Sequence, residues 1–382
     1  MAISLRGLLR SNFKLFNANI LSPVSYNVTR SIYSPEALSM DSYINSRATI
    51  ATQFQTVSET FRAKMNEFTN DENKSLIFTE DLKAMLHIVD NNPEDINLMT
   101  KMLEKYSAQN NELRFGNYVF GPVVMRTYYY LDMPDLAYEM FKSSKMNGFF
   151  DQLTSYQILL CLLYKHNKYA EVREVYDIIK SKSTAQLVHP HNSVVTVLAS
   201  CFKENTPESF EYAINLWSDL NRKGYDPSRK TVCLVSMLSI KQGKPEFALE
   251  FMWNFPRYRH IDLRCTKLEA LIALKRFSDI SQFLSKCLQN EKFDAKPLTF
   301  FKDPIDHLIK AIEEDPSGKE EIAKLIDEMK ARNLVQDLTL EDSILSPIEK
   351  KDRTDKAEND TVKGFRRNYK DFKARSRFSI RR

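Results

Sequence analysis

The sequence predicts an all-α fold, in which helical hairpins stack into an α-α superhelical solenoid. Only 8 of the 382 residues are glycine and 43% are hydrophobic. This composition suits helices, which lose stability at interior glycines. An apolar motif recurs several times at intervals near 35 residues, and a second apolar segment precedes most copies across a short polar turn. Such regular self-similarity is typical of repeat proteins built from small helical units.

The first 35 residues are expected to be a mitochondrial transit peptide. Arg6, Arg10 and Lys14 interrupt an apolar pattern of helical spacing, and the first acidic residue is Glu36. An amphipathic, acid-free start that carries arginine is typical of such peptides. The alternative is an ordinary basic surface helix. We expect cleavage near residues 30–34 and a mature protein in the mitochondrial matrix, with no segment long enough to span a membrane.

An N-terminal helical region is expected over residues 36–75, followed by the repeat solenoid over 76–335. The clearest repeats place Ala137, Ala213 and Ala248 at the first position, with apolar residues four and seven positions later. These positions share one face of a helix. The small first residue allows a neighbouring helix to approach closely. One hairpin cannot bury both of its faces, so the hairpins must stack and leave an inner groove.

Two repeats carry a family resemblance. One runs from Ala213 through Leu220 to Gly224-Tyr225-Asp226-Pro227, and another begins with Thr154-Ser155-Tyr156-Gln157. These segments resemble the motif of the pentatricopeptide-repeat family, and the resemblance covers about residues 70–335. It implies pentatricopeptide-type hairpins that bind single-stranded mitochondrial RNA and act in RNA maturation and thereby in respiratory-chain function. Other RNA-processing proteins are implied as further partners.

The family reads one base per repeat from two positions of the motif. The first of these positions holds Pro122, Gln157 and Cys233 here, which are not the family's usual base-reading residues, so no target sequence follows. Other residues of the first helices are expected to face the same groove. For each of them, an ordinary solvated charge or a half-buried tyrosine is the alternative. The candidate groove contacts are Arg126, Tyr129, Tyr130, Gln157, Tyr164, Lys165, Lys230 and Lys241.

Residues 336–360 are expected to be a charged linker, and residues 361–382 a basic aromatic tail. The tail has nine Lys or Arg and one acid, interleaved with aromatic residues. Cations neutralise phosphates and aromatic rings stack on bases, so the tail is a second candidate RNA contact. The alternatives are nonspecific affinity or contact with an acidic partner. Its candidate residues are Arg366, Arg367, Lys370, Lys373, Arg375 and Arg377.

The two ends carry most of the positive charge. The first 35 residues contribute +4 and the tail +8 to the net charge of +5, which leaves residues 36–360 at −7. Overall basicity is therefore weak support for RNA binding by the folded body. The acidic body and the missing base-reading residues favour an alternative function, a protein–protein interaction scaffold in the matrix.

No catalytic chemistry stands out in the sequence. The five cysteines are far apart and form no C-x-x-C pair, which fits buried thiols in a reducing compartment. The sequence has no glycine-rich phosphate loop followed by Lys-Ser or Lys-Thr. His189-Pro190-His191 lacks a third metal ligand nearby. We therefore expect no cofactor, no metal and no enzymatic activity.

Overall fold

A computed structural model describes residues 31–70, 75–109, 118–182, 189–253, 259–290, 298–314 and 319–349. Within these ranges the chain is almost entirely helical, which confirms the predicted all-α class. A short 3₁₀ turn, η2 (Ser144–Met146), and two paired strands interrupt the helices. Most of the expected transit peptide lies outside the described residues, as does the whole basic tail with its six candidate contacts.

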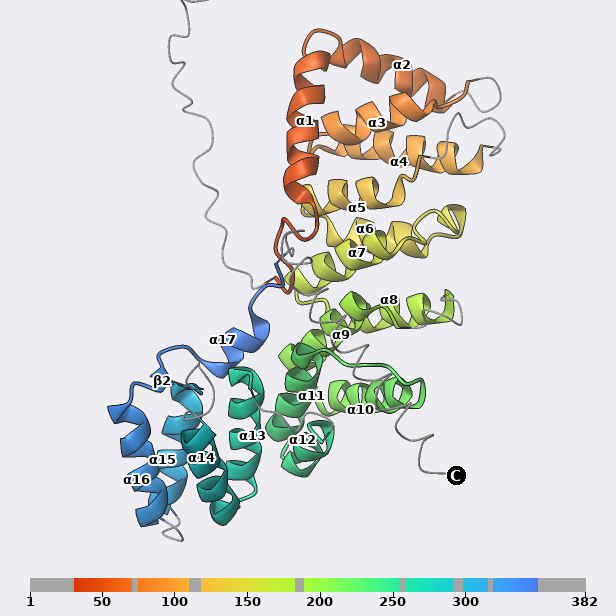
Figure 1. Cartoon of the computed structure of the whole chain (residues 1–382). Helices are drawn as coiled ribbons and strands as arrows, with labels where there is room; N and C mark the ends of the chain where they lie inside the picture. Colours follow the sequence, from red (N-terminus) through yellow and green to blue (C-terminus); the bar gives the residue numbers. More distant parts are fainter. Residues whose placement is uncertain are drawn as a thin grey trace, which may run out of the picture.

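Seven consecutive hairpins form the stack shown in Figure 1. Two helices precede them, α1 (Met40–Phe54) and α2 (Ser58–Asn70). The hairpins are α3 (Thr79–Ile88) with α4 (Pro93–Ala108), α5 (Gly121–Tyr130) with α6 (Pro134–Lys142), α7 (Leu153–Lys165) with α8 (Tyr169–Lys182), α9 (His191–Glu204) with α10 (Pro207–Arg222), α11 (Arg229–Lys241) with α12 (Pro245–Phe251), α13 (Ile261–Ala273) with α14 (Phe277–Asn290), and α15 (Lys302–Glu314) with α16 (Lys319–Ala331).

The hairpins make two layers. The first helices pack on one another in order from α5 to α15, and second helices such as α14 and α16 pack together in the other layer. We call the side of the first-helix layer that faces away from the second helices the inner face. Helix α1 crosses this face at α3 and α5. The stack bends, and a last helix, α17 (Leu340–Leu345), lies in the bend (Figure 1).

Local sequence explains how each hairpin turns. A residue with positive φ follows the first helix in five hairpins, which permits a tight reversal without a further helical turn. These residues are Asp132, Asn167, Asn205, Gly243 and Lys275. Most second helices begin with proline, whose fixed φ suits the first helical turn. The step between α7, α9 and α11 is 38 residues from start to start, longer than the expected 35.

The core lies between the two layers, as the apolar positions of the repeat motif predict. Ala137, Ala213 and Ala248 are fully buried. The Trp217 ring packs against the Phe251 ring of the next hairpin, with centroids 5.1 Å apart. The small residues therefore lie where helices approach closely, and the large ones fill the space one turn away.

A two-stranded parallel sheet closes the last hairpin. Strand β1 (Phe300–Phe301) precedes α15 and pairs with β2 (Val335–Gln336), which follows α16. The chain then enters α17, within the segment expected to be a charged linker. Leu340, Ile344 and Leu345 of this helix are buried. At least residues 340–345 are thus part of the folded body.

Candidate nucleic-acid interface

The inner face carries a row of lysines at the carboxyl ends of three first helices. Lys165, Lys203 and Lys241 each lie twelve residues after the start of α7, α9 and α11. Equivalent positions on stacked helices line up along a solenoid, so these ammonium groups form one row. Lys203 was missed at the level of sequence, although its 38-residue spacing from Lys165 and Lys241 is the signal that identifies it.

At the N-terminal end of the face, helix α1 and the residues just before it contact two candidate residues. The Arg126 side chain donates through Nε to the Leu38 carbonyl oxygen at 2.9 Å. The Tyr130 ring packs edge-on against Tyr43, with centroids 5.9 Å apart, and lies 4.8 Å from the Arg47 guanidinium. Arg126 and Tyr130 therefore help to hold α1 and the residues before it, while Tyr130 stays 44% exposed.

In the middle of the face, the candidate side chains contact one another or neighbouring repeats. Lys165 forms a 2.7 Å ion pair with Asp132 and lies 5.5 Å from the centre of the Tyr129 ring. Tyr164 is buried. The Gln157 side-chain oxygen accepts a 2.9 Å hydrogen bond from Asn192 of the next repeat. These contacts tie repeat to repeat.

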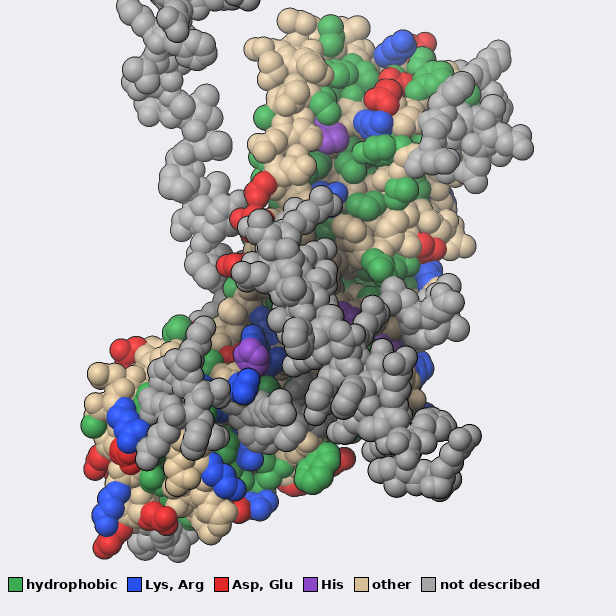
Figure 2. All heavy atoms as spheres, in the orientation of Figure 1, with side chains coloured by type: hydrophobic (Ala, Val, Ile, Leu, Met, Phe, Trp, Pro, Cys, Tyr) green, Lys and Arg blue, Asp and Glu red, His purple; other side chains and the backbone are tan. Residues whose placement is uncertain are grey.

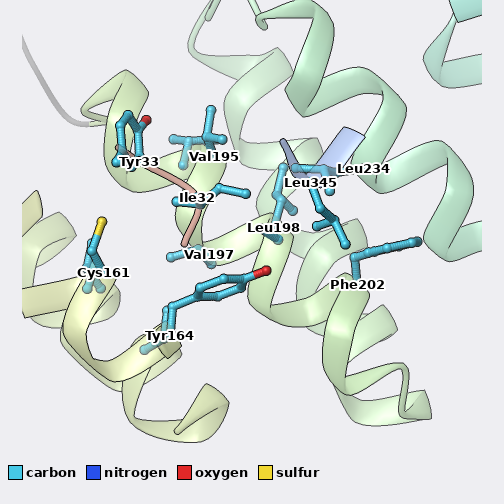
Figure 3. Packing of buried hydrophobic residues seen from close by; sticks show 14 of the residues in the cluster. Ile32, Tyr33, Cys161, Tyr164, Val195, Val197, Leu198, Phe202, Leu234 and Leu345 are labelled. Carbon is cyan, nitrogen blue, oxygen red and sulfur yellow. The ribbon is translucent and has the colours of Figure 1, made fainter. Parts of the chain in front are cut away.

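Residues 31–39, here called the inner arm, lie against this part of the face. The Tyr33 hydroxyl donates to the Asn192 carbonyl oxygen at 3.3 Å. Ile32 and Tyr33 are buried, and Figure 3 shows them next to Val195 and Val197 of α9. The arm thus covers the first helices near Gln157.

Residues 338–349, here called the inner strap, cover the C-terminal half of the face. Glu341 accepts from Lys203 at 2.8 Å and from Lys241 at 2.9 Å. The half-buried Lys230 donates to the Ser346 carbonyl oxygen, and burial lowers the pKa of its ammonium group to about 8. The strap thus binds two of the predicted groove lysines, Lys230 and Lys241, and also Lys203, which was not predicted.

Further contacts fix the strap along the stack. The Asp303 carboxylate accepts from the Leu340 backbone nitrogen at 3.0 and 2.9 Å. The Ser343 hydroxyl donates to Asp262 at 2.6 Å. Leu345 lies close to Leu234 and Phe202 in Figure 3. The Thr339 side chain caps the helix by accepting from the Asp342 nitrogen. This cap followed by acidic residues was the available sequence signal for α17.

The arm and the strap are joined to each other. Tyr33 and Ile348 form a parallel β-bridge. The Ile348 nitrogen donates to the Ile32 carbonyl oxygen at 3.0 Å, and the Ser34 nitrogen donates to the Ile348 carbonyl oxygen at 3.2 Å. Together with α1, these segments cover much of the inner face between α3 and α15.

The structure also shows what the base-reading positions do. Cys233 is fully buried, so its thiol is not available to a base at the inner face. Ser228, the residue before α11, caps this helix by accepting from the Thr231 nitrogen. Cys233 therefore contributes to the packing of α11 and not to a contact at the inner face.

Charge on the visible surface is mixed. Figure 2 shows Lys and Arg side chains interspersed with Asp and Glu over the C-terminal hairpins, with no single basic field among the coloured residues of that view.

The two histidines of the His189-Pro190-His191 segment each pair with a tyrosine hydroxyl. His189 pairs with Tyr176 and His191 with Tyr225, both at 2.7 Å. No helix within the described ranges is long and apolar enough to cross a lipid bilayer.

Comparison with known proteins gives the chain its relatives. No protein-family model matches it. It is 26% identical over 262 residues to the human mitochondrial pentatricopeptide repeat-containing protein 2, which covers 68% of the chain and 65% of the human protein. The mouse protein of that name is 29% identical over 56% of the chain and 54% of its own length, and the Xenopus laevis protein 26% over 45% and 44%. The chain thus spans about half the length of the curated relatives that it matches. This all-helical repeat chain is therefore similar in sequence to the mitochondrial pentatricopeptide repeat-containing protein 2 of vertebrates.

Proposed function

We propose that this chain is a mitochondrial RNA-binding protein of the pentatricopeptide-repeat type, located in the matrix. In this proposal it holds single-stranded mitochondrial RNA, takes part in RNA maturation together with other RNA-processing proteins, and so contributes to respiratory-chain function. It holds RNA without catalysing a reaction. The relatives support this proposal because their names carry both the mitochondrial location and the repeat.

The observation that carries the proposal is the lysine row on the inner face. Lys165, Lys203 and Lys241 recur at equivalent positions of consecutive hairpins. Each ammonium group is half-buried or exposed at the surface and pairs with a carboxylate that a phosphate can replace. A repeating cation along a helical stack suits the repeating charge of a polynucleotide backbone. The basic tail is a second proposed contact, and its six candidate cations would add affinity without reading bases.

Filter binding tests the proposal with an unstructured single-stranded RNA and the full chain. Affinity should fall steeply with salt, because each phosphate contact releases a counterion. Lys165→Gln should weaken binding about two- to fivefold and reduce the salt slope by about 0.7, the value for one contact on a single strand. Lys286→Gln, on the outer helix α14, is the matched control and should change neither. Binding that does not respond to salt would argue against phosphate contacts.

A protein-interaction scaffold is the second candidate, and the covered inner face favours it. The arm and the strap occupy a surface that an RNA strand would need, and residues 36–360 have a net charge of −7. Immunoprecipitation before and after RNase treatment separates the two functions. A scaffold keeps its protein partners after RNase treatment, whereas partners that bind through RNA are lost.

A further inference from the structure

The inner strap places a carboxylate between two neighbouring repeats. Glu341 accepts from Lys203 of α9 at 2.8 Å and from Lys241 of α11 at 2.9 Å. A carboxylate and a phosphodiester carry the same single negative charge and accept the same charge-assisted hydrogen bonds. Glu341 thus occupies the position at which a phosphate group would bridge these two lysines.

We propose that the strap is an autoinhibitory lid, which must leave the inner face before RNA can bind between α9 and α13. The proposal rests on the RNA-binding function proposed above and adds a regulatory step to it. Strap and RNA compete for the same lysines, so the strap sets how much of the face is open to RNA.

The groups that the strap holds are suited to a nucleic acid. Its release frees Lys203, Lys230 and Lys241 together, since all three bind strap atoms. The Phe202 ring lies next to Leu345 in Figure 3, and the Lys241 ammonium is 4.1 Å from the centre of this ring. Release of the strap takes Leu345 away from this ring, which lies beside the Lys241 cation, and an aromatic ring beside a cation is a combination that binds unpaired bases.

The strap has the properties of a segment that opens locally. Helix α17 has only six residues, and a helix of this length is not stable without tertiary contacts. Docking orders the whole strap at a cost in conformational entropy. Against that cost stand three buried side chains and a few polar contacts, including two ion pairs that are partly exposed. Segments with such a small net gain open far more often than the whole fold.

A charge-removing variant tests the lid. Glu341→Gln weakens the contact to both lysines without removing volume, and should raise the affinity of the full chain for polyuridylate about three- to tenfold, as expected for two partly exposed ion pairs. Glu349→Gln makes the same change at an exposed residue of the same strap and should leave the affinity unchanged. Circular dichroism of both variants checks that the helical stack is intact.

Hydrogen exchange of the wild-type chain gives a second readout that needs no variant. Polyuridylate should increase amide exchange in residues 340–348 and decrease it in α9 and α11. The lid proposal is contradicted if RNA binds while exchange in the strap is unchanged or reduced and both variants bind like wild type. That result would leave the proposed RNA binding itself supported. If neither wild type nor any variant binds polyuridylate, the RNA function and the lid both fall.

Discussion

A single carboxylate, Asp219, connects two outer helices. Its oxygens are 2.7 Å from the Lys180 ammonium of α8 and 3.3 Å from that of Lys223, which follows α10. The His189 Nε2 atom lies 3.3 Å away. The hydrogen bond from Lys180 is the largest cause that lowers the pKa of Asp219 to about 2, helped by Lys223 and opposed by burial. The ionised carboxylate is thus stabilised by folding.

This pKa predicts how stability depends on acid. The folded pKa lies below the ordinary value of 3.8, so the contribution of Asp219 is present above about pH 4 and is lost as the pH falls towards 2. Asp219→Asn should remove about 1–2 kcal/mol of unfolding free energy at pH 7 and little at pH 2. Urea unfolding across this pH range measures it. Asp226→Asn, at an exposed carboxyl, is the control, and equal losses at both pH values would contradict the prediction.

For single residues, the sequence predicted on which helix a side chain lies, but not which residue it would bind. The periodic pattern assigned Lys230 and Lys241 to the first helices, and they do lie there. Their partners, Ser346 and Glu341, lie about a hundred residues further along the chain, as the hydrogen bonds show. A repeat motif carries local information about which face a residue occupies. It carries none about a distant segment that folds back on that face.

At the scale of elements, close helix packing depends on one small residue in each of three hairpins, Ala137, Ala213 and Ala248. Ala213 of α10 is fully buried, one turn before Trp217. Interiors are packed at near-crystalline density, so extra methylene groups at such a position force neighbouring side chains apart. The alanines of the repeat motif were predictable from sequence because the spacing of one turn is set by the helix itself.

Ala213→Leu should therefore destabilise the protein by about 1–3 kcal/mol through overpacking. Asn215→Leu adds the same side chain at an exposed position of the same helix and should change stability by less than about 0.5 kcal/mol. The midpoint of urea unfolding compares the two variants. An Ala213→Leu variant as stable as wild type would mean that α10 has free space at its inner side.

Helix α17 shows why one element escaped prediction. Its sequence, Leu-Glu-Asp-Ser-Ile-Leu, is too short for helical periodicity to be distinguished from chance. The charges around it favour a solvated linker on composition alone. Its three apolar side chains become buried only because α11 and α13 provide a surface against which they pack. The hairpins were predictable because each carries its own pattern, whereas α17 depends on the completed stack.

At the scale of the whole molecule, the arm makes the start of the described chain part of the core. Ile32 and Tyr33 are buried on the inner face, and their backbone pairs with Ile348. A transit peptide that ended at residue 35 would remove these contacts. We therefore expect cleavage before Ile32, so that the mature protein keeps the arm.

Two shortened chains test this expectation. A chain that begins at Ser31 should be as stable as the full chain, whereas a chain that begins at Pro35 should lose about 2–5 kcal/mol, because two large apolar side chains no longer become buried. Thermal or urea unfolding compares them. Mass spectrometry of the protein from its native compartment gives the actual first residue, and a start beyond Tyr33 would contradict the prediction.

The bridge between Tyr33 and Ile348 also has a consequence for the order of folding. A polypeptide leaves a ribosome or an import channel with its amino end first, so the hairpins can form one after another from local contacts. The backbone pairing of the arm, in contrast, must wait until Ile348 has emerged, long after Tyr33. Until then the backbone of Ile32 and Ser34 lacks its hydrogen bonds to Ile348, although the side chains of Ile32 and Tyr33 can already pack against α9. A nascent chain that stalls before Ile348 would thus carry most of the stack, with the part of the inner face that the strap covers still open to solvent.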